Sequence, residues 1–358
     1  MRVLVTGHEG YIGAVLVPMV RESGHEVVGL DTGFYTGCDF GTPPAPVPAI
    51  ARDLRDVVPG DLAGIDAVMH LAAISNDPIG HLNPETTYAI NAHASVRLAE
   101  AARAAGVRRF LFSSSCSLYG AAGDAPVDER SAFNPVTPYG HSKVIAEEGI
   151  HALADAGFSP VSLRNATAFG ISPRLRGDVV INNLVGWAHA TGEVRLQSDG
   201  RQWRPLVHVR DICTAFIALL DADRDAVHDQ AFNVGRDDNN LRIRTVAELV
   251  QAEVPRSRVT FAEGAGADVR DYRVDFTKLR ERVPAAVPAW SVEDGIREVA
   301  EAYARVGLTI EDLTGPRFTR LARINELKAA GNLDDDLRWR PAAIEAPGAA
   351  PAAGVVHG

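Results

Sequence analysis

Short runs of hydrophobic residues alternate with longer helical patterns through the first half of the chain. The runs that predict strands are residues 3–6, 27–31, 67–73, 108–115 and 160–165. The stretches between them that predict helices are residues 12–23, 85–105 and 135–156, with Gly106 as a stop and Thr137 as a cap. This alternation predicts a parallel sheet covered by helices on both faces, with ligands at the carboxyl ends of the strands.

The pattern loosens after Phe169 into shorter elements. We therefore predict two interleaved parts: a sheet domain over residues 1–168, to which residues 206–230 return, and a smaller α+β substrate lobe over residues 169–205 and 231–340. Residues 341–358 are almost all Ala, Pro and Gly, which predicts a disordered tail.

Three glycines follow the first predicted strand at three-residue spacing: Gly7, Gly10 and Gly13. Strand, tight turn and helix in this order place the helix N-terminus against an anion, typically the diphosphate of a dinucleotide. Tyr11 and Ile12 complete the turn, so their backbone is expected to face the same ligand.

Asp31 ends the second run, about 20 residues beyond this turn. A carboxylate there accepts hydrogen bonds from both adenosine ribose hydroxyls and repels a 2′-phosphate, which favours NAD over NADP. Asp53, with Leu54 beside it, either faces the adenine amino group or caps residues 56–62. Leu71, Ala72 and Ala73 end the third run and should border the cofactor.

Composition excludes several classes of partner. The 358 residues carry a net charge of −10, which argues against nucleic acid or an anionic membrane as the main partner. Three widely separated cysteines and scattered histidines predict neither a disulfide framework nor a metal site. The absence of a leader pattern or a long apolar run predicts a cytoplasmic protein.

Tyr139 and Lys143 lie at positions i and i+4 of a predicted helix, on one face. A tyrosine normally titrates near pH ~10. We expect Lys143, together with the positive nicotinamide of NAD⁺, to lower the pKa of Tyr139 and make the phenol a usable general base. Ser115, which ends the preceding strand, could hydrogen-bond the same substrate oxygen.

These motifs, together with Phe112–Gly120 and Trp203–Val209, resemble the extended short-chain dehydrogenase/reductase family, in its NAD-dependent nucleotide-sugar epimerase and dehydratase branch. The resemblance covers about residues 1–330 and implies a Rossmann-type α/β fold with a doubly wound parallel sheet. It implies a catalytic trio of Ser115, Tyr139 and Lys143, of which the last two also contact the cofactor. It further places Ser113 and Asn91 at the cofactor site.

The resemblance also implies the substrate, a nucleotide-diphosphate sugar, and the residues that bind it. Asn183 and Leu184 match the segment that touches the diphosphate, and Arg204 and Arg270 match the phosphate-binding arginines. Thr167 matches a position that faces the sugar. An acidic protein that binds a diphosphate needs such arginines locally, and a surface ion pair is the less favoured alternative for each of them.

Departures from the family patterns favour one reaction. The 4,6-dehydratases carry an Asp-Glu pair after the serine strand end, whereas this chain has Cys116 and Ser117. Cys116 should point away from the site, into the core. Epimerisation at C4, with internally recycled NAD, needs only the serine, tyrosine and lysine. The alternatives are an NAD(P)H-dependent 4-keto-sugar reductase of the same fold and a non-catalytic dinucleotide sensor or scaffold.

Two features concern assembly. The helices at residues 92–105 and 138–156 resemble those of the family's four-helix dimer contact, so we expect a homodimer. Residues 307–340 extend past the usual end of the family core. They could cover the substrate lobe or extend a subunit interface, and the sequence leaves both possibilities open.

Overall fold

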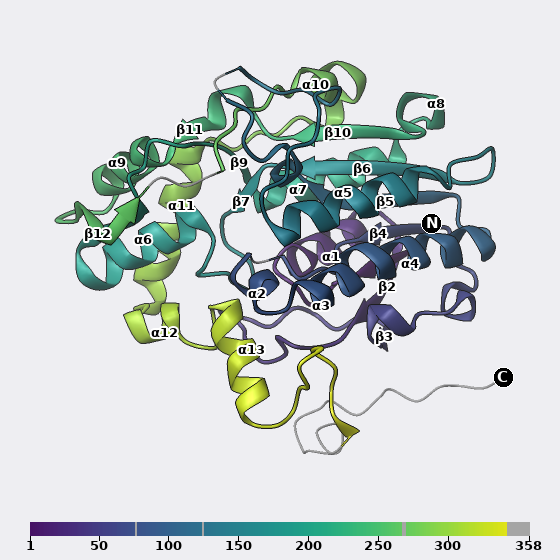
Figure 1. The fold of residues 1–358 in the computed structure, drawn as a ribbon, viewed down its shortest axis with the longest axis horizontal. Coiled ribbons are helices and arrows are strands. Elements are labelled where there is room, and N and C mark those ends of the chain that lie inside the picture. Colours follow the sequence, from purple (N-terminus) through teal and green to yellow (C-terminus); the bar gives the residue numbers. More distant parts are fainter. Residues whose placement is uncertain (76, 124, 267–269, 342–358) are drawn as a thin grey trace.

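The computed structural model describes residues 1–75, 77–123, 125–266 and 270–341, so the predicted tail lies outside the described residues except for its first position. A seven-stranded parallel sheet forms its centre, in the order β10-β6-β5-β4-β1-β2-β3 (Figure 1). The strands are β1 (Arg2–Thr6), β2 (Glu26–Asp31), β3 (Ala49–Ala51), β4 (Ala67–His70), β5 (Arg109–Ser115), β6 (Ser159–Asn165) and β10 (Gln230–Val234). The predicted doubly wound α/β fold is confirmed.

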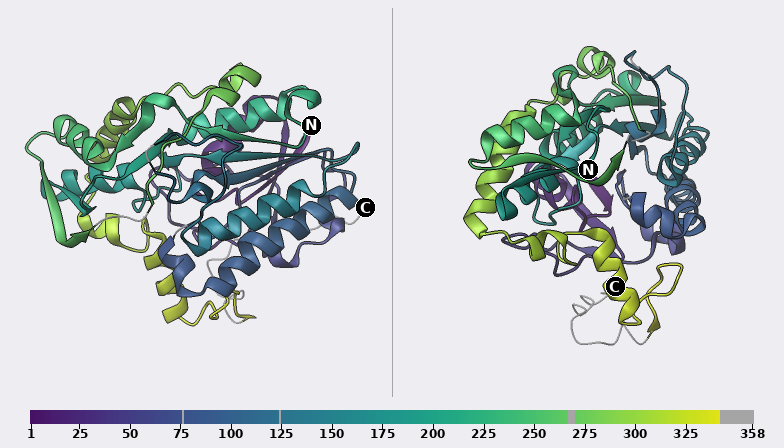
Figure 2. Two further views of the ribbon diagram at one scale, coloured as in Figure 1. Left: turned by 45° about the horizontal axis from the view of Figure 1, so that its top comes forward. Right: turned by 60° about the vertical axis from the view of Figure 1, so that its left-hand side comes forward.

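Helices cover both faces of this sheet, because its central strands are apolar on both sides. On one face, α1 (Gly13–Glu22) and α7 (Val209–Asp221) pack against each other and against strand residues such as Val5 and Met69. On the other face, α4 (Ala94–Ala104) and α5 (Pro138–His151) pack on Leu4 and Phe110, and they run side by side in Figure 2. The predicted helix over residues 85–105 is interrupted by a π-helical stretch, Ala89–His93.

A second lobe with its own core lies beyond the carboxyl ends of the strands (Figure 1). Its strands form two small sheets, β11-β9-β7 and β12-β8. They are β7 (Thr167–Phe169), β8 (Glu193–Ser198), β9 (Trp203–His208), β11 (Asn240–Arg242) and β12 (Arg258–Gly266). The helices of this lobe are α6 (Val180–Thr191), α9 (Ile243–Glu253) and α11 (Val292–Val306), and shorter helices elsewhere are α2 (Asp77–Leu82), α3 (Pro84–Tyr88), α8 (Arg224–Val227) and α10 (Thr277–Arg282).

The two parts interleave at boundaries that differ slightly from those predicted. Strand β7 pairs with β9 in the second lobe, so this lobe begins at Thr167. Strand β10 pairs with β6, so the segment that returns to the central sheet runs to Val234 and not to Gln230. Strand β9 belongs to the lobe up to His208, and the return therefore begins with α7.

The C-terminal segment, residues 307–340, spans both parts of the molecule. Helix α12 (Ile310–Thr314) packs on α6 of the second lobe, and α13 (Arg320–Ala329) crosses to the central domain (Figure 1). There, Ile324 and Leu327 share a small core with Phe34. The first part of the segment therefore covers the second lobe, one of the two roles left open by the sequence, and the rest joins this lobe to the central domain.

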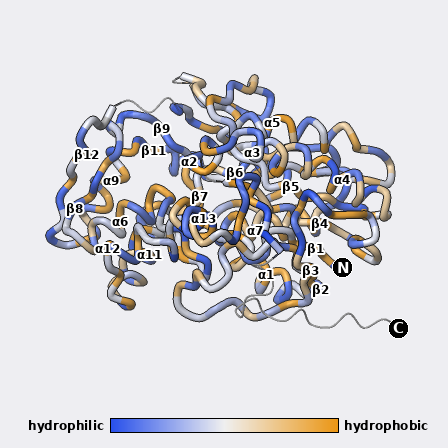
Figure 3. Tube along the Cα trace, turned by 60° about the horizontal axis from the view of Figure 1, so that its bottom comes forward, coloured by the Kyte–Doolittle hydropathy of each residue, from blue (hydrophilic) through white to orange (hydrophobic). Residues whose placement is uncertain are grey.

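Figure 3 shows that hydrophobic residues follow one another only in short stretches along the tube. Within the described parts of the chain, no helix has the length and apolar character that a membrane crossing requires.

Candidate active site

One cavity of about 1000 Å³ lies where the second lobe meets the carboxyl ends of the central strands. Nearly all the residues predicted from the sequence line it. From the central domain these are Gly7, Gly10, Tyr11, Ile12, Gly13, Asp31, Asp53, Leu54, Leu71, Ala72, Ala73, Ser113, Ser115, Tyr139 and Lys143. From the second lobe they are Thr167, Asn183, Leu184, Arg204 and Arg270. Asn91 is the exception.

The glycine turn has the geometry that its spacing predicts. Gly7 has a φ of 70°, and its N–H donates to the Leu30 carbonyl oxygen of β2 over 2.8 Å, which fixes the turn between β1 and α1. A Cβ on Gly13 would strike the Gly7 carbonyl oxygen and would lie 2.7 Å from His8 backbone atoms. Only glycine therefore lets α1 begin directly on the turn, with its N-terminal N–H groups toward the cavity.

Asp31 ends β2 at the rim of the same cavity. Its carboxylate accepts hydrogen bonds from the N–H groups of Glu9, over 3.1 Å, and Gly33, over 2.9 Å. Burial raises the pKa of this carboxyl above its ordinary value, while the Gly33 N–H acts in the opposite direction. The two backbone donors thus hold the Asp31 carboxylate in place at the rim of the cavity.

Asp53 caps the short helix Leu54–Asp56, whereas the sequence indicated residues 56–62 as the segment that it would cap. Both carboxylate oxygens contact the Arg55 guanidinium, at 2.9 and 2.5 Å. Burial opposes ionisation of this carboxyl, but the Arg55 hydrogen bonds outweigh it and lower the pKa of Asp53. Asp53 also borders the cavity, so capping does not exclude contact with an adenine.

Asn91 lies behind the cavity wall and not on it. Its side chain is fully buried, accepts from the Ile74 N–H over 2.7 Å, and donates to the Ile74 carbonyl oxygen and to Ser142 Oγ. It therefore positions the loop after β4 against α5. In the described structure Asn91 therefore does not line the cofactor cavity, contrary to the expectation. It acts indirectly, by holding the loop that does.

Lys143 and Tyr139 enter the cavity from the first turns of α5, which begins at the Thr137 cap. The Lys143 Nζ donates to the Ser113 carbonyl oxygen over 2.7 Å and lies 5.8 Å from the centre of the Tyr139 ring. Burial lowers the pKa of Lys143 to about 7.

The chain alone does not lower the pKa of Tyr139. Burial raises it to about 12, although a hydrogen bond with Ser115 acts in the opposite direction. The lowering expected from Lys143 is not supplied by the chain, because an ammonium whose own pKa is about 7 is a weak source of positive charge. A further cation near the phenol is needed to make it a base.

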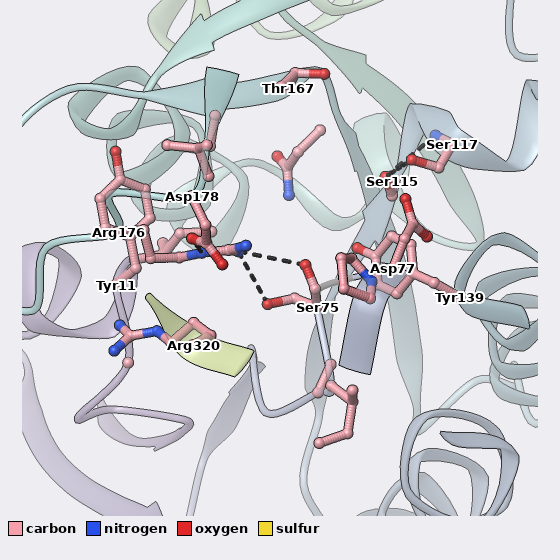
Figure 4. A pocket seen from close by; sticks show the side chains of 18 of the residues that line it. Tyr11, Ser75, Asp77, Ser115, Ser117, Tyr139, Thr167, Arg176, Asp178 and Arg320 are labelled. Atoms are coloured by element: carbon pink, nitrogen blue, oxygen red, sulfur yellow. Dashed lines mark hydrogen bonds and ion pairs between the residues drawn. The ribbon is translucent and has the colours of Figure 1, made fainter. Parts of the chain in front are cut away.

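The serine strand end turns Cys116 away from the cavity, as expected. The Cys116 side chain is buried in the core and its Sγ lies 3.1 Å from the Arg164 carbonyl oxygen. Ser117 lines the cavity, and its hydroxyl oxygen accepts from Ser115 Oγ over 3.1 Å (Figure 4). The positions that carry acids in 4,6-dehydratases thus contribute one hydroxyl group and no carboxylate.

The predicted substrate residues line the far part of the cavity. The Asn183 amide donates to the Gly177 carbonyl oxygen at the start of α6. Arg204 is buried, donates to the Trp203 and Arg270 carbonyl oxygens, and lies over the Tyr272 ring. The Arg270 guanidinium forms an ion pair with Asp77 over 2.6 Å. The Arg204 side chain thus contacts the backbone of Arg270, and both arginines line the same cavity.

The sequence did not predict several charged residues on the cavity wall, among them Asp77, Arg176, Asp178 and Arg320 (Figure 4). Asp77 follows the loop after β4, and its position at a strand's carboxyl end was a usable signal. Arg176 and Asp178 follow β7 in the same way. Arg320 comes from the C-terminal segment, and no local pattern in the sequence places it in the cavity.

The sequence model of one known protein family, the NAD dependent epimerase/dehydratase family, matches residues 3–235 of this chain. The chain belongs to this family.

Among its relatives, UDP-glucose 4-epimerase of Mycolicibacterium smegmatis is 30% identical and covers 85% of this chain and 98% of its own length. The solved structure of MoeE5 in complex with UDP-glucose and NAD is 29% identical, with a TM-score of 0.74, over 86% of this chain and 99% of its own. The structure of TunA, an NAD-dependent NDP-hexosamine 5,6-dehydratase, has a TM-score of 0.75 at 24% identity over 85% and 98%, and shows the shared fold.

NAD is the cofactor of this epimerase/dehydratase family member. The cavity suits it, because the glycine turn leaves room for a backbone approach and Asp31 is held at the ribose end. When bound, NAD supplies the hydride acceptor and donor.

Proposed function

We propose that this protein is a C4 epimerase of nucleotide-diphosphate sugars, which oxidises the 4-hydroxyl and reduces the resulting 4-keto sugar in one cavity. The observation that carries the proposal is the wall beside Tyr139. Ser115 and Ser117 face the cavity there while Cys116 lies in the core, so the strand end offers hydroxyl groups and no carboxylate for eliminating water. The similarity to UDP-glucose 4-epimerases supports the same reaction.

In this proposal Tyr139 takes the proton from the 4-hydroxyl group. It returns the proton after the 4-keto sugar has rotated to present its opposite face. Ser115 donates a hydrogen bond to the same oxygen, which stabilises charge on it. The Lys143 ammonium is fixed by its hydrogen bond to the Ser113 carbonyl oxygen, so that it stays close to the Tyr139 phenol. Burial holds the pKa of Tyr139 at about 12 in the chain alone, so the phenol would need the positive charge of bound NAD⁺ nearby to act as a base.

The second lobe holds the other end of the substrate. Arg204 and Arg270 would bind the diphosphate, with Asn183 and Leu184 beside it and Thr167 toward the sugar. A substrate anchored by its diphosphate could rotate its sugar in the part of the cavity that NAD leaves open, without leaving the protein. The exposed face of the α4 and α5 pair, which includes Ile145, is the surface through which we propose that two copies form a homodimer.

The experiment incubates the purified protein with UDP-glucose, without added oxidant or reductant, and separates the products by ion-pair chromatography. Epimerisation predicts a product of unchanged mass that returns to UDP-glucose when it is used as the substrate. A stoichiometric requirement for added NADH or NADPH would contradict the proposal and favour the reductase. Complete lack of turnover over a panel of nucleotide sugars would favour a non-catalytic dinucleotide sensor.

Asp77 favours a second candidate, the elimination of water from the sugar. One of its carboxylate oxygens is buried and has no hydrogen-bond partner among the described residues, and its charge acts on Tyr139. Such a carboxylate is a possible acid or base. Asp77→Asn decides between the two, with exposed Asp225→Asn as the matched control. If the protein is an epimerase, the Asp77→Asn variant should still form a product of unchanged mass, with turnover reduced less than ~10-fold. If it is a dehydratase that uses Asp77, the variant should no longer form the keto product.

A further inference from the structure

Arg320 is a buried cation on the wall of the cofactor cavity. Its side chain belongs to α13 and is only 4% exposed. One guanidinium nitrogen donates to the Arg174 carbonyl oxygen over 3.1 Å, and the group lies 3.9 Å from the centre of the Tyr35 ring. Among the described residues, none of the carboxylates forms an ion pair with it.

The charge around Arg320 is therefore unbalanced. Asp178, the nearest carboxylate that affects it, is bound by Arg176 over 2.8 Å, so two guanidinium groups face one carboxylate. Burial lowers the pKa of Arg320, while Tyr35 and Asp178 act in the opposite direction. Because an unpaired buried cation is costly, an anion is expected to complete this part of the cavity.

The position of Arg320 identifies the anion. Arg320 and Arg176 lie beside Tyr11, on the side of the cavity away from Tyr139 (Figure 4). Tyr11 belongs to the glycine turn at the N-terminus of α1, where backbone N–H groups favour a diphosphate. We propose that Arg320, assisted by Arg176, binds the diphosphate of NAD, and that the C-terminal segment thereby forms part of the cofactor site.

Contacts on both sides of Asp31 hold the C-terminal segment in this position. Trp339 Nε1 donates to the Thr32 carbonyl oxygen over 2.7 Å. Arg55 donates to the Asp336 carbonyl oxygen over 2.7 Å, and the Arg338 guanidinium pairs with Asp56 over 2.6 Å. These contacts fix the C-terminal segment to the residue after β2 and to the short helix after β3, next to the part of the chain that carries Asp31.

The inference rests on NAD as the cofactor and not on the epimerase reaction. Its test therefore measures binding without turnover. The variants are Arg320→Met, Arg320→Lys and Arg176→Met, with exposed Arg305→Met as the control that removes the same charge outside the cavity. Bound NAD is quantified in the purified proteins, and its dissociation is followed in excess ADP-ribose. Titration calorimetry on cofactor-stripped protein compares ADP-ribose with adenosine, which lacks the diphosphate.

Loss of a charge-assisted hydrogen bond predicts that Arg320→Met weakens ADP-ribose binding by ~10- to 100-fold. Adenosine binding should change less than ~2-fold, the lysine variant should lie between, and Arg305→Met should match the wild type. Equal losses for adenosine and ADP-ribose, or unchanged retention of NAD, would overturn the inference. If Arg320→Met does not fold, the lysine and Arg176→Met variants decide on the same criteria. A protein without epimerase activity that still shows this pattern would refute only the proposed reaction.

Discussion

The Lys143 ammonium donates a hydrogen bond to the Ser113 carbonyl oxygen, with 2.7 Å between Nζ and O. This bond ties α5 to the end of β5, so the helix that carries Tyr139 is fixed relative to the strand that carries Ser115. The three proposed catalytic residues therefore keep their positions through a contact with the backbone.

Tyr139→Phe tests the proposed base. The variant keeps the ring and its packing but loses the group that exchanges the proton, so turnover should fall at least ~100-fold. NAD content should be unchanged. Tyr88→Phe, which removes a hydroxyl outside the cavity, should retain full turnover. Activity measured by product separation that is equal in all three proteins would show that the phenol takes no part.

Lys143 predicts a pH dependence of stability. Burial lowers its pKa from 10.5 to about 7 in the folded chain. The unfolded chain therefore binds more protons between these values, and the contribution of Lys143 to the free energy of unfolding rises with pH through this window. Urea denaturation of the cofactor-stripped protein should show that wild type gains stability relative to Lys143→Met from pH 7 to pH 9. A constant difference between the two proteins would contradict the lowered pKa.

Gly13→Ala tests the contact between α1 and the glycine turn. The added Cβ would meet backbone atoms of Gly7 and His8, which cannot move aside, so the variant should lose ~1–3 kcal/mol of stability and much of its NAD. Gly60→Ala is the matched control, because a Cβ there meets no atom within 4 Å. Thermal unfolding and cofactor content distinguish the pair. Equal behaviour would show that the turn has room for a side chain.

Arg204→Met tests the proposed diphosphate site. Loss of one charged donor to a phosphate should raise KM by ~10- to 100-fold, with a smaller effect on kcat. Arg244→Met removes an exposed arginine that pairs only with Glu248 among the described residues, and its kinetics should match the wild type. An unchanged KM in Arg204→Met, with normal folding by circular dichroism, would place the diphosphate elsewhere.

Local chemistry explains which features the sequence predicts. Gly7 and Asp31 act through backbone geometry and strand ends, and both lie where their spacing indicates. The prediction that Asn91 lines the cavity was wrong, because a side chain behind the cavity wall and one on it have the same sequence pattern. Arg320 could not be predicted, because its place depends on how α13 packs across a chain separation of about 290 residues from Phe34.

The spacing of Tyr139 and Lys143 does not by itself give the pKa of the phenol. The i and i+4 spacing places an ammonium near the phenol, but burial acts on both groups, raising one pKa to about 12 and lowering the other to about 7. Spacing gives proximity, whereas desolvation depends on the complete tertiary structure.

The fate of the hydrogen at C4 tests the central claim most directly. The protein is incubated with UDP-glucose that carries deuterium at C4, and the product is analysed by NMR and mass spectrometry. Epimerisation with internally recycled NAD predicts that the product keeps the deuterium at C4, with inverted configuration. Deuterium found at another carbon, or lost to an external pool of reduced cofactor, would contradict the account.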